Sequence, residues 1–239
     1  MRYSRSLMIH PANIRAITLD LDDTLWPIAP TMVRAEAVLR HYLREHAPAT
    51  AHLCTQPDTM PRIRQQVQRE WHDRLHDLSG LRRETIRRAL VEAGDDPALA
   101  ESAFEHFFEA RQHVDLYEDS LDALSSLAAR YPLVALSNGN ADVHRVGLGK
   151  HFHAAISAQA FGVAKPDPRI FTPALEVLGS PDPSRVGYIG DSFINDVAGA
   201  AAADCARAES CARGAPARVP DESTEAVESF GIFVESGLC

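Results

Sequence analysis

The chain has 239 residues, of which 45% are hydrophobic, and its formal net charge is −9. Its length and apolar content suffice to bury one α/β core and a smaller second unit. The negative charge argues against nucleic acid as a partner, and the N-terminus has no apolar run long enough for export or membrane insertion. We therefore expect a cytoplasmic protein without a membrane partner. The sequence does not distinguish a monomer from a homodimer.

The first predicted element is a buried strand that ends in carboxylates. Residues 14–19 form an apolar run, and Asp20-Leu-Asp22-Asp-Thr24-Leu25 follows it directly. Parallel sheets bind ligands at the carboxyl ends of their strands, so two acids spaced i, i+2 at this point indicate a site. Taken alone, the same pair fits equally well with a turn whose carboxylates cap backbone N–H groups.

The next part of the chain has a different character, with apolar residues at helical spacing and many charges. It predicts amphipathic helices over residues 31–44, 61–76, 80–93 and 97–114. Arg82 and Arg83, with Arg87 and Arg88, are candidates for contacts to a substrate's phosphate or ring, although arginines on a helix usually form a solvated face. Trp26 could stack on a substrate ring or pack at a hinge.

Three later segments place polar groups after apolar strands or at the start of a helix. Residues 133–137 and 186–190 are apolar runs that predict buried strands, and Pro168 opens a helix that Asp167 is expected to cap. The polar residues that end or follow these strands, or that precede the helix, are Ser137, Asn138, Lys165, Asp191 and Asp196. Several loops of a doubly wound sheet can converge on one ligand, so these groups are candidates for the site of the first two aspartates.

The ordered motifs resemble those of a known family. Asp-x-Asp-x-Thr, then Ser-Asn, then Lys-Pro, then Gly-Asp with an Asp five residues on, is similar to the motif set of the haloacid dehalogenase superfamily. This resemblance implies an α/β fold: a doubly wound, Rossmann-like parallel sheet with an inserted helical cap. It places the core at residues 1–26 and 116–239 and the cap at residues 27–115. Most members are magnesium-dependent phosphatases that act on small phosphorylated molecules.

A closer likeness lies within that superfamily. The opening motif and residues 131–140 and 147–152 look like the corresponding parts of the bacterial riboflavin-pathway phosphatases. Those enzymes remove phosphate from 5-amino-6-(5-phospho-D-ribitylamino)uracil and often hydrolyse FMN and small sugar phosphates. The likeness suggests a substrate without fixing one.

The chemistry of phosphate esters assigns roles to the first acids. A carboxylate and a phosphate repel each other unless a cation bridges them, and Mg²⁺ prefers oxygen ligands. We expect Asp20 and Asp191 to supply such ligands, with the Asp22 carbonyl oxygen added by the resemblance. Asp20 is then the nucleophile that forms an aspartyl-phosphate, and Asp22 is the general acid and base.

The remaining polar residues are expected to bind or orient. Ser137 and backbone amides near Asn138 are predicted to hold phosphoryl oxygens, and Lys165 is predicted to place a positive charge against the transferring group. Asp196 is expected to lie outside the set of direct metal ligands, where it orients Lys165 or a metal-bound water.

The C-terminal part departs from the family pattern. Residues 202–218 contain no Val, Ile, Leu or aromatic residue, which makes them a poor strand where the family continues with a buried one. Either an edge strand is lost or weakly formed, or the reading frame has shifted before this tail.

Other functions remain open at this point. A 2-haloacid dehalogenase of the same fold needs neither Mg²⁺ nor an acid such as Asp22, so the acid pair argues against it. A catalytically impaired binding protein of the same fold is suggested by the tail. A phosphomutase would retain the same nucleophile.

Overall fold

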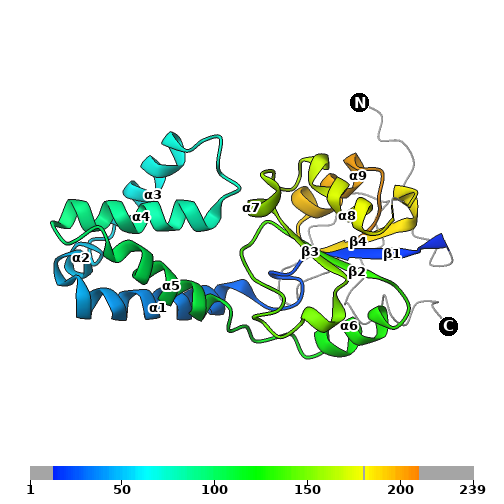
Figure 1. Cartoon of the computed structure of the whole chain (residues 1–239), viewed down its shortest axis with the longest axis horizontal. Coiled ribbons are helices and arrows are strands. Elements are labelled where there is room, and N and C mark those ends of the chain that lie inside the picture. Colours follow the sequence, from blue (N-terminus) through cyan, green and yellow to red (C-terminus); the bar gives the residue numbers. More distant parts are fainter. Residues whose placement is uncertain (1–12, 180, 210–239) are drawn as a thin grey trace. The chain divides into compact units, whose positions relative to one another are not determined.

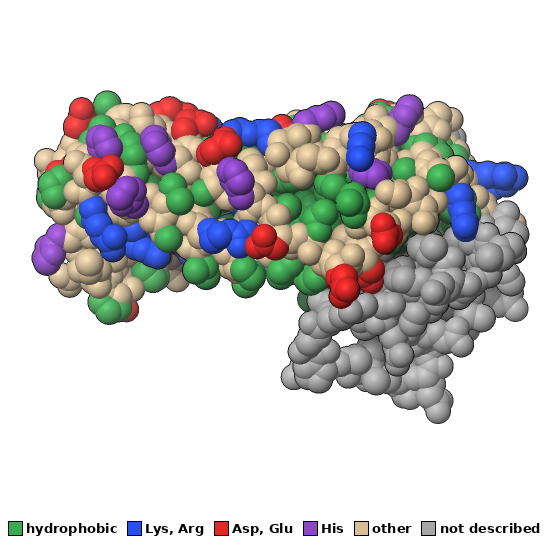
Figure 2. Space-filling model, turned by 90° about the horizontal axis from the view of Figure 1, so that it is seen from below, with side chains coloured by type: hydrophobic (Ala, Val, Ile, Leu, Met, Phe, Trp, Pro, Cys, Tyr) green, Lys and Arg blue, Asp and Glu red, His purple; other side chains and the backbone are tan. Residues whose placement is uncertain are grey.

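The computed structural model describes residues 13–179 and 181–209, which form two compact units. The first consists of residues 13–27, 116–139, 143–179 and 181–209, and the second of residues 28–115 and 140–142. Within these residues, none of the helices combines the length and apolar composition that a membrane crossing requires. On the face shown in Figure 2, acidic, basic and histidine side chains are interspersed, so no patch of a single charge covers the described part of that face.

A five-stranded parallel sheet forms the centre of the first unit, with strand order β3-β2-β1-β4-β5 (Figure 1). The strands are β1 (Ala16–Leu19), β2 (Leu133–Ser137), β3 (Ala154–Ser157), β4 (Val186–Gly190) and β5 (Ala206–Glu209). The three central strands, β2, β1 and β4, are buried along their whole length, which is why they read as apolar runs in the sequence. The predicted parallel α/β sheet is confirmed.

Helices lie on both sides of this sheet. In Figure 1, α6 lies on one side, and α8 and α9 lie on the other. The helical elements of this unit are α6 (Ser120–Ala128), η2 (Gly149–His151), α7 (Ala158–Phe161), η3 (Pro168–Phe171), α8 (Thr172–Val177), η4 (Pro183–Arg185), the π-helical η5 (Phe193–Ala198) and α9 (Gly199–Ala202). Asp167 accepts a hydrogen bond from the backbone N–H of Arg169 at 3.0 Å, so the predicted cap of η3 is confirmed.

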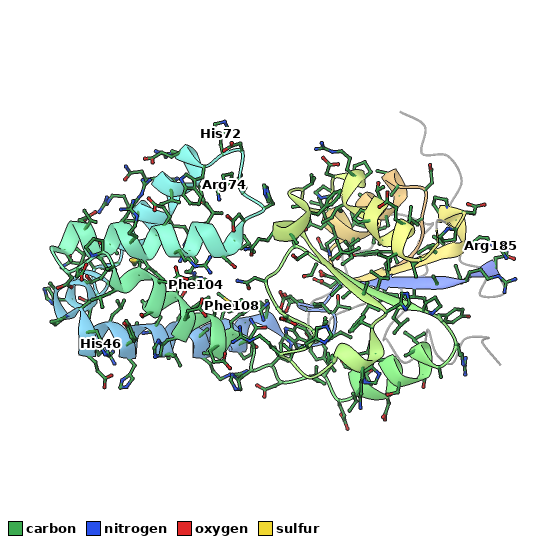
Figure 3. The ribbon with its side chains drawn as sticks, in the orientation of Figure 1. His46, His72, Arg74, Phe104, Phe108 and Arg185 are labelled. Carbon is green, nitrogen blue, oxygen red and sulfur yellow. The ribbon has the colours of Figure 1, made fainter. Side chains whose placement is uncertain are left out.

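The register of the central strands brings their carboxyl ends to one edge. Leu19, the last residue of β1, pairs with Ala135 of β2 and with Ile189 of β4. Asp20 follows β1 at this level, and its backbone N–H donates to the Ile189 carbonyl oxygen at 2.9 Å. Arg185, labelled in Figure 3, precedes β4 and so marks the opposite edge of the sheet.

Five helices build the second unit. They are α1 (Ile28–His46), α2 (Pro48–Leu53), α3 (Thr59–Glu70), α4 (Leu78–Ala93) and α5 (Leu99–Arg111). Apolar residues of α1, α4 and α5 form one buried cluster, and those of α3 and α4 form a second. Phe104 and Phe108 of α5 stack with ring centroids 5.5 Å apart (Figure 3). Helices were predicted over most of this unit, but α3 ends before the predicted residue 76, and α2 was not predicted.

The last described strand corrects the reading of the tail. Residues 206–209 form β5 and pair in parallel with β4, so a lost edge strand is wrong at this point, whereas a weakly formed one stays a prediction. The open backbone groups of β4 explain how a sequence of low β-propensity is held in a strand. The rest of the atypical tail, and with it the hypothesis of a shifted reading frame, lies outside the described residues.

Candidate active site

Three aspartates meet at the carboxyl edge of the sheet. Asp20 follows β1, Asp191 follows β4, and Asp196 lies in the π-helical turn just beyond. One carboxylate oxygen from each lies within 4.8 Å of the other two. The structure thus brings Asp20 together with two acids that lie about 170 residues further along the chain. Asp20 and Asp191 were predicted as metal ligands, and Asp196 as their neighbour.

A buried lysine lies among these acids. The Lys165 ammonium is 3.0 Å from Asp20 Oδ2 and 2.7 Å from Asp196 Oδ1, and its side chain is 1% exposed. It also donates a hydrogen bond to the Tyr188 hydroxyl oxygen at 2.7 Å. An ammonium has three protons to donate, and these three oxygens accept them, so Lys165 is held in one orientation toward Asp20.

Tyr188 is a member of the site that sequence reasoning missed. It occupies the middle of β4, it is fully buried, and its hydroxyl donates to Asp196 Oδ1 at 2.8 Å. Its surroundings raise the pKa of this phenol well above its ordinary value, through burial first and the Asp20 and Asp196 charges next. The available signal was a tyrosine within an otherwise apolar buried strand, because a buried hydroxyl requires a partner.

Asp196 is fixed on both of its oxygens. Oδ1 accepts from Lys165 and Tyr188, and Oδ2 accepts from the backbone N–H of Ser192 at 2.9 Å. Gly190 makes room for it, since a Cβ at that position would lie 2.4 Å from Asp196 Cγ. These contacts fit the expected role of orienting Lys165, and they leave Asp20 and Asp191 as the better donors for a cation.

The loop after β2 is tied to the lysine loop. Asn138 Oδ1 accepts from the Lys165 backbone N–H at 2.8 Å, and Asn138 Nδ2 donates to the Lys165 carbonyl oxygen at 2.9 Å. The side chain of Asn138 therefore positions the backbone of Lys165, a role that the sequence did not indicate. Ser137 is buried, and its Oγ accepts from the Gly139 N–H at 3.0 Å. Phosphate binding by Ser137 and the nearby amides stays a prediction.

Asp22, the second acid of the first motif, lies in a tight turn. The next residue, Asp23, has a left-handed backbone with φ of 57°, and its N–H donates to the Trp26 carbonyl oxygen at 2.8 Å. The Trp26 indole N–H in turn donates to Asp22 Oδ1 at 2.8 Å. Trp26 is fully buried, so the predicted stacking on a substrate ring is wrong. Packing was the stated alternative, and the bond to Asp22 was not foreseen.

The two candidate arginines of the helical unit have partners within that unit. Arg82 forms an ion pair with Glu36, and its guanidinium lies 4.2 Å from the centroid of the Phe107 ring. Arg83 lies 3.1 Å from a Glu101 carboxylate oxygen and covers a phenylalanine ring. These contacts explain the positions of both arginine side chains without a substrate, and they are typical of charged residues on the surface of a helix. A contact of either arginine with a substrate stays a prediction.

Burial dominates the electrostatics of the site. It raises the pKa of Asp20 to about 6 against the opposing Lys165 charge, and it raises the pKa of Asp191 to about 6 together with the charges of Asp20 and Asp196. Among the described residues, Asp20 Oδ1 is buried and has no hydrogen-bond partner. Desolvated carboxylates with an unsatisfied oxygen suit a hard divalent cation, which would supply both charge and coordination.

Fold and site together define the class of the protein. A parallel α/β sheet with a carboxylate cluster and a buried lysine at its carboxyl edge is the framework of an α/β enzyme. Residues 14–204 match the haloacid dehalogenase-like hydrolase family, and the chain belongs to this family.

Relatives of the chain include phosphatases. It is 32% identical over 204 residues to 5-amino-6-(5-phospho-D-ribitylamino)uracil phosphatase YigB of Escherichia coli (strain K12), covering 84% of this chain and 83% of that protein. It is 35% identical over 125 residues to phosphoserine phosphatase of Thermus thermophilus, covering half of each chain. Among solved structures, a 2-haloacid dehalogenase from Pseudomonas syringae pv. Tomato DC3000 matches with a TM-score of 0.83 and 34% identity, over 93% of this chain and 97% of that one.

Proposed function

We propose that the protein is a magnesium-dependent phosphatase that hydrolyses a small-molecule phosphate monoester through an aspartyl-phosphate at Asp20. The observation that carries the proposal is the buried Lys165 ammonium, 3.0 Å from Asp20 Oδ2. This fixed positive charge lies beside the carboxylate that would attack an anionic phosphate. Such preorganised charge is the main source of catalysis in phosphoryl transfer.

The reaction divides into two displacements at phosphorus. In the first, a carboxylate oxygen of Asp20 attacks phosphorus, and the bond to the leaving oxygen breaks with its electron pair staying on that oxygen. Asp22 gives this oxygen a proton, so the product leaves as a neutral alcohol. In the second, Asp22 takes a proton from a water molecule as the water attacks phosphorus, and the electron pair of the phosphorus–oxygen bond returns to Asp20.

The acids of the site fit Mg²⁺. Asp20 and Asp191 would hold it, because Asp20 Oδ1 lacks a partner among the described residues and both carboxylates are desolvated. When bound, Mg²⁺ supplies the positive charge that lets a carboxylate approach a phosphate. Asp196 would stay with Lys165, because both of its oxygens already accept hydrogen bonds.

The proposed substrate follows the relatives. The YigB phosphatase is named for 5-amino-6-(5-phospho-D-ribitylamino)uracil, and we propose that compound or FMN as the substrate of this chain. We propose further that the helical unit acts as a cap that excludes water and contacts the leaving group.

Dehalogenation is the second candidate, because a solved structure 34% identical to this chain is described as a 2-haloacid dehalogenase. A halide leaves without a proton, so such an enzyme has no use for Asp22 as an acid. The hydrogen bond from Trp26 that holds this carboxylate favours the phosphatase.

Phosphate release from p-nitrophenyl phosphate, FMN and the ribitylaminouracil phosphate, with and without Mg²⁺, tests the proposal. Halide release from 2-chloropropionate is measured in parallel. We expect metal-dependent phosphate release that is lost in Asp20→Asn and retained in Asp122→Asn, an exposed acid on α6 that serves as the matched control. A folded, magnesium-treated protein that is inert on all phosphates, or one that releases halide instead, would overturn it.

A further inference from the structure

The contact between Trp26 and Asp22 has a geometry suited to acid catalysis. The indole Nε1 donates to Asp22 Oδ1 at 2.8 Å, and the tryptophan side chain is fully buried. An indole N–H is a donor and never an acceptor. Because the ring is buried, its N–H is directed to this one oxygen of Asp22 and cannot turn to solvent.

The backbone around Trp26 is also held. The Asp23 N–H donates to the Trp26 carbonyl oxygen at 2.8 Å, and residues 22 and 26 form an isolated parallel bridge. The Leu25 carbonyl oxygen accepts from the Tyr117 N–H at 3.0 Å and from Ser120 Oγ at 2.8 Å. Trp26 is therefore anchored through its own backbone and through a second segment of the same unit, which makes it a rigid support.

We propose that Trp26 is a positioning residue for the acid step, in that its buried N–H donates to Asp22 Oδ1 and holds this carboxyl group in one orientation. The inference rests on the proposed function, because it concerns the proton that Asp22 gives to the leaving oxygen. In that step the O–H bond of the Asp22 carboxyl group breaks and its proton goes to the leaving oxygen, and the same carboxylate later takes the proton of the attacking water.

The leaving group provides a specific readout. An alkyl phosphate such as glycerol phosphate releases an alkoxide that needs a proton, whereas p-nitrophenyl phosphate releases a stabilised phenolate that does not. General acid catalysis contributes about 10²–10⁴-fold where it is needed. For Trp26→Phe we expect the ratio of kcat/KM for the alkyl ester to kcat/KM for the aryl ester to fall about tenfold or more. A variant that is merely less stable would lose both activities equally.

The chain offers a matched control, because it contains two tryptophans, and the second, Trp71, lies in the helical unit. Trp71→Phe is expected to leave the ester ratio unchanged. In that variant Trp26 is the sole tryptophan, so incorporation of benzothienylalanine replaces the indole N–H by sulfur at this site alone and preserves its shape. This protein is expected to show the same fall in the ester ratio, and it keeps the test valid if Trp26→Phe folds poorly.

A double-mutant comparison separates action through Asp22 from other effects. Asparagine at position 22 has no acidic proton to give to the leaving oxygen. Adding Trp26→Phe to Asp22→Asn should therefore leave the ester ratio the same as in Asp22→Asn alone. Equal losses on both esters, an unchanged ratio in the benzothienylalanine protein, or the same fall in the Asp22→Asn background would each overturn the inference while the phosphatase stands. Wild-type protein inert on both esters would instead overturn the proposed function, and the inference with it.

Discussion

Replacing Asp196 with asparagine removes one negative charge from the buried cluster around Lys165 without changing its volume. The carboxylate accepts three hydrogen bonds, from Lys165 Nζ at 2.7 Å, Tyr188 OH at 2.8 Å and the Ser192 N–H at 2.9 Å. An amide has only one oxygen. In either orientation its NH₂ group would therefore face a donor, and at least one buried donor would lose its acceptor.

The expected loss of stability follows from these contacts. Lys165 keeps Asp20 as a partner at 3.0 Å, so its charge stays compensated, and the expected cost is that of a buried donor that loses its acceptor, about 1–3 kcal/mol. For a chain of this size that corresponds to a fall in Tm of about 2–12 °C. Turnover of a phosphate ester should also fall about 10- to 100-fold, because Lys165 is no longer held toward Asp20.

Thermal melting followed by circular dichroism, together with phosphate release, checks this expectation. The control is Asp204→Asn, an exposed aspartate with φ of 57°, a conformation that asparagine tolerates well. Its melting temperature should stay near that of the wild type. If Asp196→Asn melted with the control and kept full turnover, the account of Lys165 as a group positioned by Asp196 would be refuted.

Three further predictions follow from the same cluster and from the helical unit. Gly190→Ala places a Cβ 2.4 Å from Asp196 Cγ, so we expect a loss of about 1–3 kcal/mol in the free energy of unfolding together with reduced turnover; unchanged values of both would contradict it. The pKa of Asp20 and of Asp191 is raised from 3.8 to about 6. Between pH 3.8 and about 6 the metal-free folded protein therefore binds more protons than the unfolded chain, and its stability falls as the pH rises through this range. Since Mg²⁺ requires the deprotonated carboxylates, the rise in Tm that it causes should be small near pH 5 and large above pH 6, and an equal rise at both would argue against these ligands. Arg82→Met should lower the melting temperature by a few degrees and leave the order of substrate KM values unchanged, whereas a KM increase confined to one substrate would show a substrate contact.

The sequence was sufficient for the sheet and for the acids at its edge. Buried parallel strands read as apolar runs, and their polar ends meet at one edge of a sheet whatever the intervening sequence. Asp20, Asp191 and Lys165 could therefore be grouped before their distances were known. The cap of η3 by Asp167 was equally accessible, because an acid before a helix-opening proline is a local signal.

The contacts between side chains distant in the sequence were not accessible. Tyr188 looked like one more apolar strand residue, and no pattern indicates that its hydroxyl meets a lysine 23 residues away. The pairing of Arg82 with Glu36, 46 residues apart, depends on how two helices pack. β5 was underestimated for a related reason, because an available strand edge outweighed its low β-propensity.

The central claim is that Asp20 becomes covalently phosphorylated, and trapping that species tests it most directly. A radiolabelled phosphate ester is mixed with excess enzyme and Mg²⁺, the reaction is quenched in acid within a single turnover, and the protein is digested and mapped. We predict acid-stable label on the peptide that contains Asp20, its absence in Asp20→Asn, and its accumulation in Asp22→Asn under an ester that needs no proton. Wild-type turnover without label on that peptide, or label on another residue, would contradict the account.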